Sequence, residues 1–317
     1  MMKEVIEPVD VKLIEEELKQ NKLLRHTNKA NNELYIVNHY NAPNIVKEIG
    51  RLREISFRDA GGGSGLDCDL DKYDTAEIPY EQLIVWDPSE KEILGGYRFI
   101  LGKTIANFEN PEKYLATSKL FEFSDKFKKD YLPYMVELGR SFVQPAYQST
   151  QRGKKSLFAL DNLWDGLGAI WYNNPDHKYF FGKVTMYTHY NAEARNLILY
   201  FLNKHFGDRE KLLYPKKPLD TKMDIEKMAS ILYEDDFQAN QKILSQEVRA
   251  RGEVIPPLIN AYLNLSPTPR CFGTVINDGF GEVEETAIML TAEDLYEEKT
   301  KRHIESYIQH LENNKLM

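Results

Sequence analysis

Apolar residues along the chain alternate between helix-like stripes and short strand-like runs. They recur at helical spacing over residues 9–24 and again from Asn44 to Phe57, which predicts two amphipathic helices. Between them, residues 34–39 form a short apolar run that predicts a first strand. The glycine-rich stretch at residues 61–65 cannot continue regular structure, so we expect a mobile loop there.

Strands come first after this loop, and then helices and strands alternate. Apolar runs predict strands at residues 82–86, 93–101, 134–143, 178–188, 270–276 and 286–291. Helical spacing predicts helices at residues 158–171, 192–206, 239–249, 257–265 and 293–312, with a short one near 121–129. This order predicts an α/β (α+β) fold with one mixed central sheet and helices on both faces.

The same order divides the chain into one core and an insertion. We expect residues 1–30 to form a helical extension and residues 31–206 to form the first part of the core. Residues 207–250, which begin with a proline-containing stretch, are expected to be a helical insertion. Residues 251–317 are then expected to complete the sheet and to end in a terminal helix.

Composition narrows the class of protein. The chain has 317 residues, of which 42% are hydrophobic and 28% charged, as in soluble globular proteins. Its net charge of −8 argues against a general nucleic-acid binder. The first 24 residues lack the apolar centre of a signal peptide, and no apolar run approaches the roughly 20 residues that span a bilayer. We therefore expect a cytoplasmic protein, and leave peripheral contact with the inner membrane face open.

The spacing of the relevant residues does not match several familiar catalytic and metal-binding motifs. Cys68 and Cys271 fit no metal or redox motif, which predicts two free thiols. Residues 67–78 begin like a calcium loop but lack its glycine and its final glutamate. The glycine-rich stretch is not followed by the Gly-Lys-Ser/Thr of a phosphate-binding loop, and the seven histidines form no HExxH pair. We expect no bound metal.

Charged residues inside apolar strands remain to be explained. Arg98 interrupts the strand at 93–101, and Glu137 and Arg140 interrupt the strand at 134–143. Buried charges are costly unless paired, so ion pairs that only stabilise the sheet, such as Arg98 with Glu137, are one explanation. Residues three apart on a regular strand face opposite sides, so Glu137 and Arg140 share a face only if a bulge separates them, and we expect it at Gly139. Such a bulge exposes backbone N–H groups that can stabilise the oxyanion of a thioester reaction.

In order and spacing, these residues resemble an established set of motifs. The set is Arg53-x-x-x-Phe57, Asp69-x-Asp71-x-x-Asp74, Gly96-Tyr97-Arg98 and Glu137-Leu138-Gly139-Arg140. It resembles the pattern shared by acyl-homoserine-lactone (autoinducer) synthases and by the hemolysin-like N-acyltransferases that make lyso-ornithine and lyso-glycine lipids. The segments Leu163–Leu167, Phe181–Val184 and Pro256–Leu263 resemble the aminolipid enzymes in particular. The resemblance covers roughly residues 45–290.

The resemblance implies a GNAT fold and a reaction. A (3-hydroxy) fatty acyl group would pass from an acyl-carrier-protein thioester to the α-amino group of an amino acid, ornithine or glycine. Glu137 is expected to accept the amine proton, and Arg140 and Arg98 to fix Glu137 and the carboxylate of the acceptor. The residues expected on the substrate side are Arg53, Phe57, Asp69, Asp71 and Asp74. No permanently bound cofactor is implied.

The expected donor site departs from that of GNAT enzymes that use coenzyme A. In their pyrophosphate loop the last position is Gly or Ala, where this chain has a lysine. A basic loop at a helix N-terminus suits the single phosphodiester of an acyl-phosphopantetheine, although a solvated basic turn is an equal alternative. The residues predicted to bind the donor are Arg152, Gly153, Lys154 and Lys155. An acidic acyl carrier protein is the expected partner, and coenzyme A the less favoured donor.

Three other functions are weighed against this one. A homoserine-lactone synthase is disfavoured by the long C-terminal half, and a coenzyme-A-dependent N-acetyltransferase by the altered loop. A hemolysin-like lytic protein is disfavoured because no spanning segment or strongly apolar amphipathic helix is visible. The acyl chain is expected in a tunnel between the strands at 134–143 and 178–188. Aromatic residues near it are either tunnel lining or ordinary core: Trp164, Trp171, Tyr179, Phe180 and Phe181.

Overall fold

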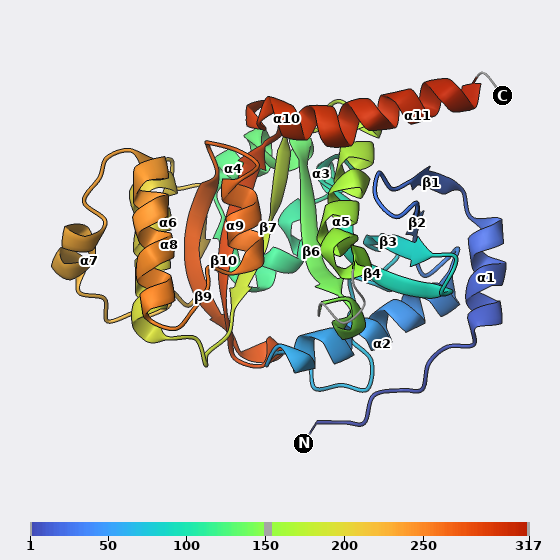
Figure 1. Ribbon diagram of the computed structural model, residues 1–317, viewed down its shortest axis with the longest axis horizontal. Helices are drawn as coiled ribbons and strands as arrows, with labels where there is room; N and C mark the ends of the chain where they lie inside the picture. The colour runs from blue at the N-terminus through green and yellow to red at the C-terminus, as the bar shows by residue number, and fades with distance from the viewer. Residues whose placement is uncertain (1, 149–153, 316–317) are drawn as a thin grey trace.

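An eight-stranded mixed sheet forms the centre of the computed structural model, which describes residues 2–148 and 154–315 (Figure 1). The strand order is β1-β2-β3-β4-β6-β7-β10-β9. The bounds are β1 Leu23–His26, β2 Glu33–Val37, β3 Glu81–Asp87, β4 Glu92–Leu101, β6 Met135–Val143, β7 Tyr179–Met186, β9 Arg270–Asn277 and β10 Val283–Thr291. All neighbours are antiparallel except β6 and β7, which run parallel at the middle of the sheet. A small second sheet pairs β5 (Phe121–Phe123) with β8 (Leu213–Pro215).

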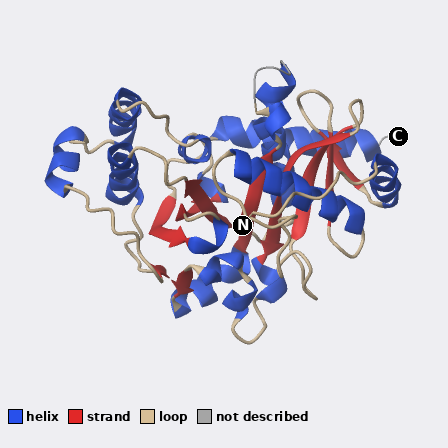
Figure 2. Cartoon of the chain, turned by 90° about the horizontal axis from the view of Figure 1, so that it is seen from below, coloured by secondary structure: helices blue, strands red, loops and turns tan. Residues whose placement is uncertain are grey.

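Helices lie on both sides of the strands (Figure 2). Because side chains alternate along a strand, neighbouring residues of β3 point to opposite faces of the sheet. Ile84 packs in a core with α1 (Val11–Gln20) and α2 (Pro43–Asp59). Leu83 packs in a different core beneath α5 (Lys154–Asn173). The α2 face carries the charged residues described below, and the α5 face is apolar.

A third core joins β7 and β10 to the C-terminal helices. It contains Val184 and Ile288 from the strands, packed against α6 (Ala192–Phe206) and its neighbours. The other α-helices in the described part of the chain are α3 Gly102–Ile105, α4 Asp125–Asp130, α7 Ile225–Ile231, α8 Phe237–Ala250, α9 Pro257–Leu263, α10 Glu297–Thr300 and α11 Ser306–Lys315. In Figure 1, α7 lies at the far left of the molecule, beyond α6 and α8.

The predicted mixed sheet is confirmed, and most predicted ranges match an element. Four predictions were wrong in detail. Residues 23–26 were expected within a helix and a helical extension, but they form the edge strand β1 because pairing with β2 satisfies their backbone groups. The segment near 121–129 begins as β5 before α4, and β8 lies within the expected helical insertion. The expected terminal helix is broken by a π-helical turn at Lys301–Glu305.

The predicted bulge in β6 is present, one residue later than expected. Arg98 pairs with Gly139 and Gly96 with Phe142, so Arg140 and Ser141 both stand opposite the single residue between them on β4. Arg140 has a left-handed backbone, with φ of 52°. A non-glycine residue in this region is strained, and such strain often accompanies a functional site.

Candidate active site

A cleft of ≈ 700 Å³ opens where β6 and β7 diverge. The two strands pair at three positions, the last of which joins Glu137 to Phe181. Beyond this point, residues 137–143 of β6 and residues 183–187 on the β7 side line the cleft. The C-terminal end of α2, Phe280, residues 253–254 and residues 256–258 also contribute to its lining. Backbone groups that would otherwise pair across the two strands are therefore available to a ligand.

Arg53 on α2 holds in place the loop that carries Asp69, Asp71 and Asp74, called the acidic loop below, which lies behind the cleft. Its Nε lies 3.0 Å from Asp69 Oδ2, and Nη1 and Nη2 each lie 3.1 Å from an oxygen of Asp74. Nη2 also donates to the Asp69 carbonyl at 2.5 Å, and Nη1 to Gln82 Oε1 at 3.5 Å. These contacts occupy all five guanidinium N–H groups of a fully buried side chain. Arg53 has no donor left for a substrate.

Arg98 on β4 is also committed to the acidic loop. Its Nη1 donates to Asp71 and Asp74, at 2.9 Å each, and its Nη2 donates to Asp71 at 3.1 Å. Burial opposes the charge of Asp74, but Arg53 and Arg98 outweigh this effect and lower the pKa of that carboxyl below its usual range. The ion pairs of Arg98 within the described residues are with aspartates, so the suggested pairing of Arg98 with Glu137 was wrong.

Glu137 on β6 is buried and hydrogen-bonded at both carboxylate oxygens. Its Oε2 accepts from the Tyr80 hydroxyl at 2.5 Å. Its Oε1 accepts from the backbone N–H of Thr117 at 2.9 Å and from the Thr117 hydroxyl. Since a carboxylate offers about four lone-pair positions, three are already taken. This geometry favours a positioning role, in which Glu137 ties the turn at residues 116–119 to β6, and its role as a base stays a prediction.

Arg140 differs from the other two arginines because its guanidinium faces the cleft. Its Nε lies 2.9 Å from Asp69 Oδ2 without hydrogen-bond geometry, and Nη2 lies 4.0 Å from Asp71. The guanidinium carbon stands 4.0 Å from the centre of the Phe280 ring and 5.9 Å from that of Phe57. Burial lowers the pKa of Arg140, with the charge of Asp69 acting against this effect. Nη1 and Nη2 make no hydrogen bond to the described residues, so they can bind a substrate.

The structure brings the predicted charged and aromatic residues together at one place. Of these, Phe57, Arg98, Glu137 and Arg140 line the cleft itself, while the aspartates and Arg53 lie behind it. The predicted donor-binding residues Arg152 and Gly153 lie outside the described residues. Lys154 and Lys155 begin α5, and Gln148, a few residues earlier, lines the cleft.

Sequence reasoning missed several residues of the site. Tyr80 and Thr117 hold Glu137, and Phe280 stacks on Arg140. Lys183 and Glu285 line the cleft on the β7–β10 side, with Nζ 3.4 Å from Oε2. Lys183 interrupts an otherwise apolar strand, the same signal that drew attention to Arg98, whereas Glu285 lies in the polar start of β10 and gives no such signal.

Other predicted features can be checked only for part of the chain. Cys68 and Cys271 are both free, as predicted, and burial raises the pKa of the Cys271 thiol to about 12. Across residues 2–148 and 154–315, no cluster of three His, Cys, Asp or Glu side chains could hold a metal ion. In the same ranges, no helix combines the length and apolarity that crossing a bilayer requires.

Comparison with known proteins identifies the family. A family model described as an acetyltransferase (GNAT) domain matches residues 52–156. A curated protein of Phocaeicola vulgatus, named glycine N(alpha)-acyltransferase, is 54% identical over 316 residues, which cover 99% of this chain and 97% of that protein. A protein of the same name from Bacteroides thetaiotaomicron is 54% identical over 308 residues, which cover 97% and 91%. The chain belongs to this family of GNAT N-acyltransferases.

The comparisons confirm the GNAT fold and the acyltransferase class that the motifs predicted. No solved structure matches the chain.

Proposed function

We propose that this acyltransferase moves a long fatty acyl group from a thioester onto the α-amino group of glycine. We propose glycine as the acceptor because it stands in the names of two relatives that match nearly the whole chain. The observation that carries the proposal is the position of Arg140. Its guanidinium, whose Nη1 and Nη2 make no hydrogen bond to the described residues, lies at a bulge, in the opening between two parallel strands, and next to an apolar pocket.

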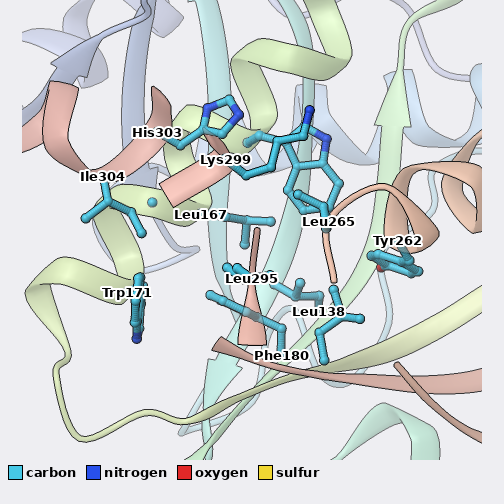
Figure 3. Close-up of a pocket in the computed structure, with 13 residues that line it drawn as sticks. Leu138, Leu167, Trp171, Phe180, Tyr262, Leu265, Leu295, Lys299, His303 and Ile304 are labelled. Atoms are coloured by element: carbon cyan, nitrogen blue, oxygen red, sulfur yellow. The ribbon is translucent and has the colours of Figure 1, made fainter. Parts of the chain in front are cut away.

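That apolar pocket is the proposed site of the acyl chain (Figure 3). On the α5 side of the sheet, it has a free volume of only ≈ 40 Å³ in this structure, so its apolar lining side chains must move apart to admit a long chain. Leu138 of β6 lines both this pocket and the cleft, so a chain attached at the cleft can pass over Leu138 into it. Of the aromatic residues expected near the acyl chain, Trp164, Trp171 and Phe180 line the pocket, whereas Phe181 belongs to the core on the other face.

The reaction requires a neutral amine and a stabilised oxyanion. The glycine ammonium first loses one proton, and its nitrogen then forms a bond to the thioester carbonyl carbon. Arg140 and the backbone N–H groups around Gly139–Ser141 stabilise the oxyanion. When the C–S bond breaks, a second proton from the nitrogen goes to the leaving thiolate, so the products are the amide and the thiol.

The remaining charged residues have a supporting role in this proposal. Asp69 contacts both Arg53 and Arg140, at 3.0 and 2.9 Å. Arg53 is saturated by the acidic loop, and Arg98 donates three hydrogen bonds to it. Both hold the loop in place, so Asp69 can orient Arg140 without neutralising its outer nitrogens.

We propose an acyl carrier protein as the donor's carrier. The N-terminal end of α5 follows closely after Gln148 at the cleft, which suits one phosphodiester there. We also propose a cytoplasmic location with peripheral contact at the inner membrane face, because the product would carry a long apolar chain. Val254, which is 65% exposed at the edge of the cleft, is available for that contact.

A substrate panel tests these proposals. The purified chain is incubated with glycine, serine or ornithine, and with long-chain acyl carrier protein, long-chain acyl-coenzyme A or acetyl-coenzyme A. The expected result is N-acylglycine, with the highest kcat/KM from the carrier protein. A preference for ornithine would overturn the acceptor, and a preference for acetyl-coenzyme A would overturn the donor.

A further inference from the structure

Lys183 of β7 and Glu285 of β10 lie in the cleft, and the reaction as described uses neither. The pairing of Lys183 with Ala287 and of Thr185 with Glu285 places both side chains on one face of the sheet. Lys183 is 18% and Glu285 6% exposed at the side chain, and both line the cleft. Two opposite charges therefore meet on its β7–β10 side.

Both groups have bonding capacity left. The Lys183 ammonium carries three N–H donors, yet its one polar contact in the described chain is the 3.4 Å ion pair with Glu285 Oε2. Glu285 Oε2 also accepts from Asn277 Nδ2 at 3.2 Å, and both of these contacts fall on the same oxygen. A largely buried ammonium with one distant partner is poorly satisfied, so a ligand in the cleft would complete its contacts.

The pair is close to the reacting atoms. Phe181 is paired with Glu137 where the two strands part. Lys183 is two residues further along β7 and on the same face as Phe181, roughly 7 Å beyond that point. Gly139 is two residues beyond Glu137 on β6, so the bulge and Lys183 flank the same opening.

We propose that Lys183 and Glu285 form the subsite for the acceptor amino acid. Lys183 binds the α-carboxylate, and Glu285 accepts the proton that the ammonium loses before the nitrogen attacks. The inference rests on the proposed function, in which the acceptor is an amino acid. Such a zwitterion carries a positive and a negative group a few bonds apart, which complements a carboxylate and an ammonium 3.4 Å apart. Glu137, with three donors already bound, fits this role less well.

Few titratable groups face Glu285. Lys183 and Tyr187 approach it from β7, and β9 contributes the neutral Asn277. Burial, together with the charge of Glu285, raises the pKa of Tyr187, which keeps that hydroxyl protonated near neutral pH.

The carboxylate contact is tested with glycine and glycinamide, which lacks the carboxylate. Lys183→Met is expected to lower kcat/KM for glycine on the order of tenfold to a hundredfold and to leave kcat/KM for glycinamide and KM for the acyl donor near wild type. Lys183→Arg should restore part of the loss. An equal loss for both acceptors would mean that Lys183 only supports the fold, and the proposal would fail.

The proton acceptor is tested with two isosteric variants, Glu285→Gln and Glu137→Gln. Glu285→Gln should lower kcat on the order of a hundredfold or more and recover activity as pH rises and free amine becomes abundant. Glu137→Gln should keep the shape of the wild-type pH profile. The reverse pattern would return the base to Glu137 and overturn the role of Glu285.

Failure of this inference can be told apart from failure of the proposed function. If the wild-type chain does not acylate glycine, the proposed acceptor is wrong. The same variants are then tested with whichever amino acid is acylated and with its amide. If the acceptor proves not to be an amino acid, the subsite proposal fails with it.

Discussion

Two charged groups border the cleft, and they differ in how completely their members are paired. The α2–β4 side holds Arg53, whose five N–H groups are all taken, and Arg98, which gives three of its five N–H groups to Asp71 and Asp74. The β7–β10 side holds Lys183 and Glu285, joined by one 3.4 Å contact. Arg140 lies between these extremes, with its Nε beside Asp69 and its outer nitrogens making no hydrogen bond to the described residues.

The difference separates structural charges from functional ones. A buried charged group whose hydrogen bonds are all made within the protein stabilises the fold only together with its partners. It has no donor or acceptor left to bind a substrate. A charge that faces a cleft with donors to spare has lost solvation without full compensation, and a ligand can supply the missing contacts. Motif matching predicted that Arg53 binds substrate and that Arg140 acts in catalysis, whereas the hydrogen bonds of Arg53 leave it no donor for a substrate.

The largest expected effect comes from removing Arg53. Arg53→Met leaves Asp69 and Asp74 buried with part of their charge uncompensated, and should reduce the free energy of unfolding by about 3–5 kcal/mol. Denaturant unfolding followed by circular dichroism measures this. Lys227→Ala, which removes an exposed ion pair with Glu193, is the control and should leave the midpoint unchanged. A change of similar size in both variants would contradict the structural role of the cluster.

Replacing Arg140 should separate activity from stability. Arg140→Gly removes the guanidinium and also relieves the left-handed backbone, so the variant should be as stable as wild type or slightly more stable. Its kcat/KM should fall on the order of a hundredfold, since a charge-stabilising donor is lost. Arg140→Ala should lose as much activity, but it should keep the strain of the left-handed backbone. Activity that survives in Arg140→Gly would rule out a direct role for the guanidinium.

Acidification is expected to destabilise the fold through the aspartates on the α2–β4 side of the cleft. Burial opposes ionisation of Asp71 and Asp74, but the neighbouring arginines lower both pKa values below those of an unfolded chain. A lowered folded pKa means that the stabilisation is complete above about pH 4 and is lost as the pH falls further. Unfolding measured across this range should show that Asp71→Asn, already less stable at pH 7, loses less on acidification than wild type. Parallel curves for the two proteins would contradict the pairing.

The smallest predicted effect concerns the rings that flank Arg140. Phe280 lies 4.0 Å and Phe57 5.9 Å from the guanidinium. Phe280→Leu should therefore lower kcat/KM by about threefold to tenfold, and Phe57→Leu by less. Steady-state kinetics with saturating donor would check the order. A larger loss in Phe57→Leu would show that the rings act through packing rather than through the charge.

The sequence predicted most of the fold because apolar spacing is strong in long elements. The limits of α6 were predicted to the residue, and the bulge in β6 followed from the need to place Glu137 and Arg140 on one face. Strand β1 was missed because four residues beside a helix carry no clear alternation, and their state depends on pairing with β2. Local pattern cannot supply that information.

The site was predicted in part, for a similar reason. The motif residues come together as expected, but the sequence does not show which arginine is saturated, since this depends on loop residues that fold back from 16 and 21 positions away. Tyr80 and Thr117, which hold Glu137, are separated from it by 57 and 20 residues. Lys183 and Glu285 face each other only because β7 pairs with β10.

Labelled lipid analysis tests the central claim most directly. Cells expressing the chain are fed ¹³C-glycine, and their lipids are compared by mass spectrometry with those of cells expressing Arg140→Gly or Lys227→Ala. The account predicts an N-acylglycine carrying the label in the wild-type and Lys227→Ala cells, and its loss in Arg140→Gly cells that contain equal amounts of folded protein. Unlabelled lipids in all cells, or equal labelling with and without Arg140, would contradict it.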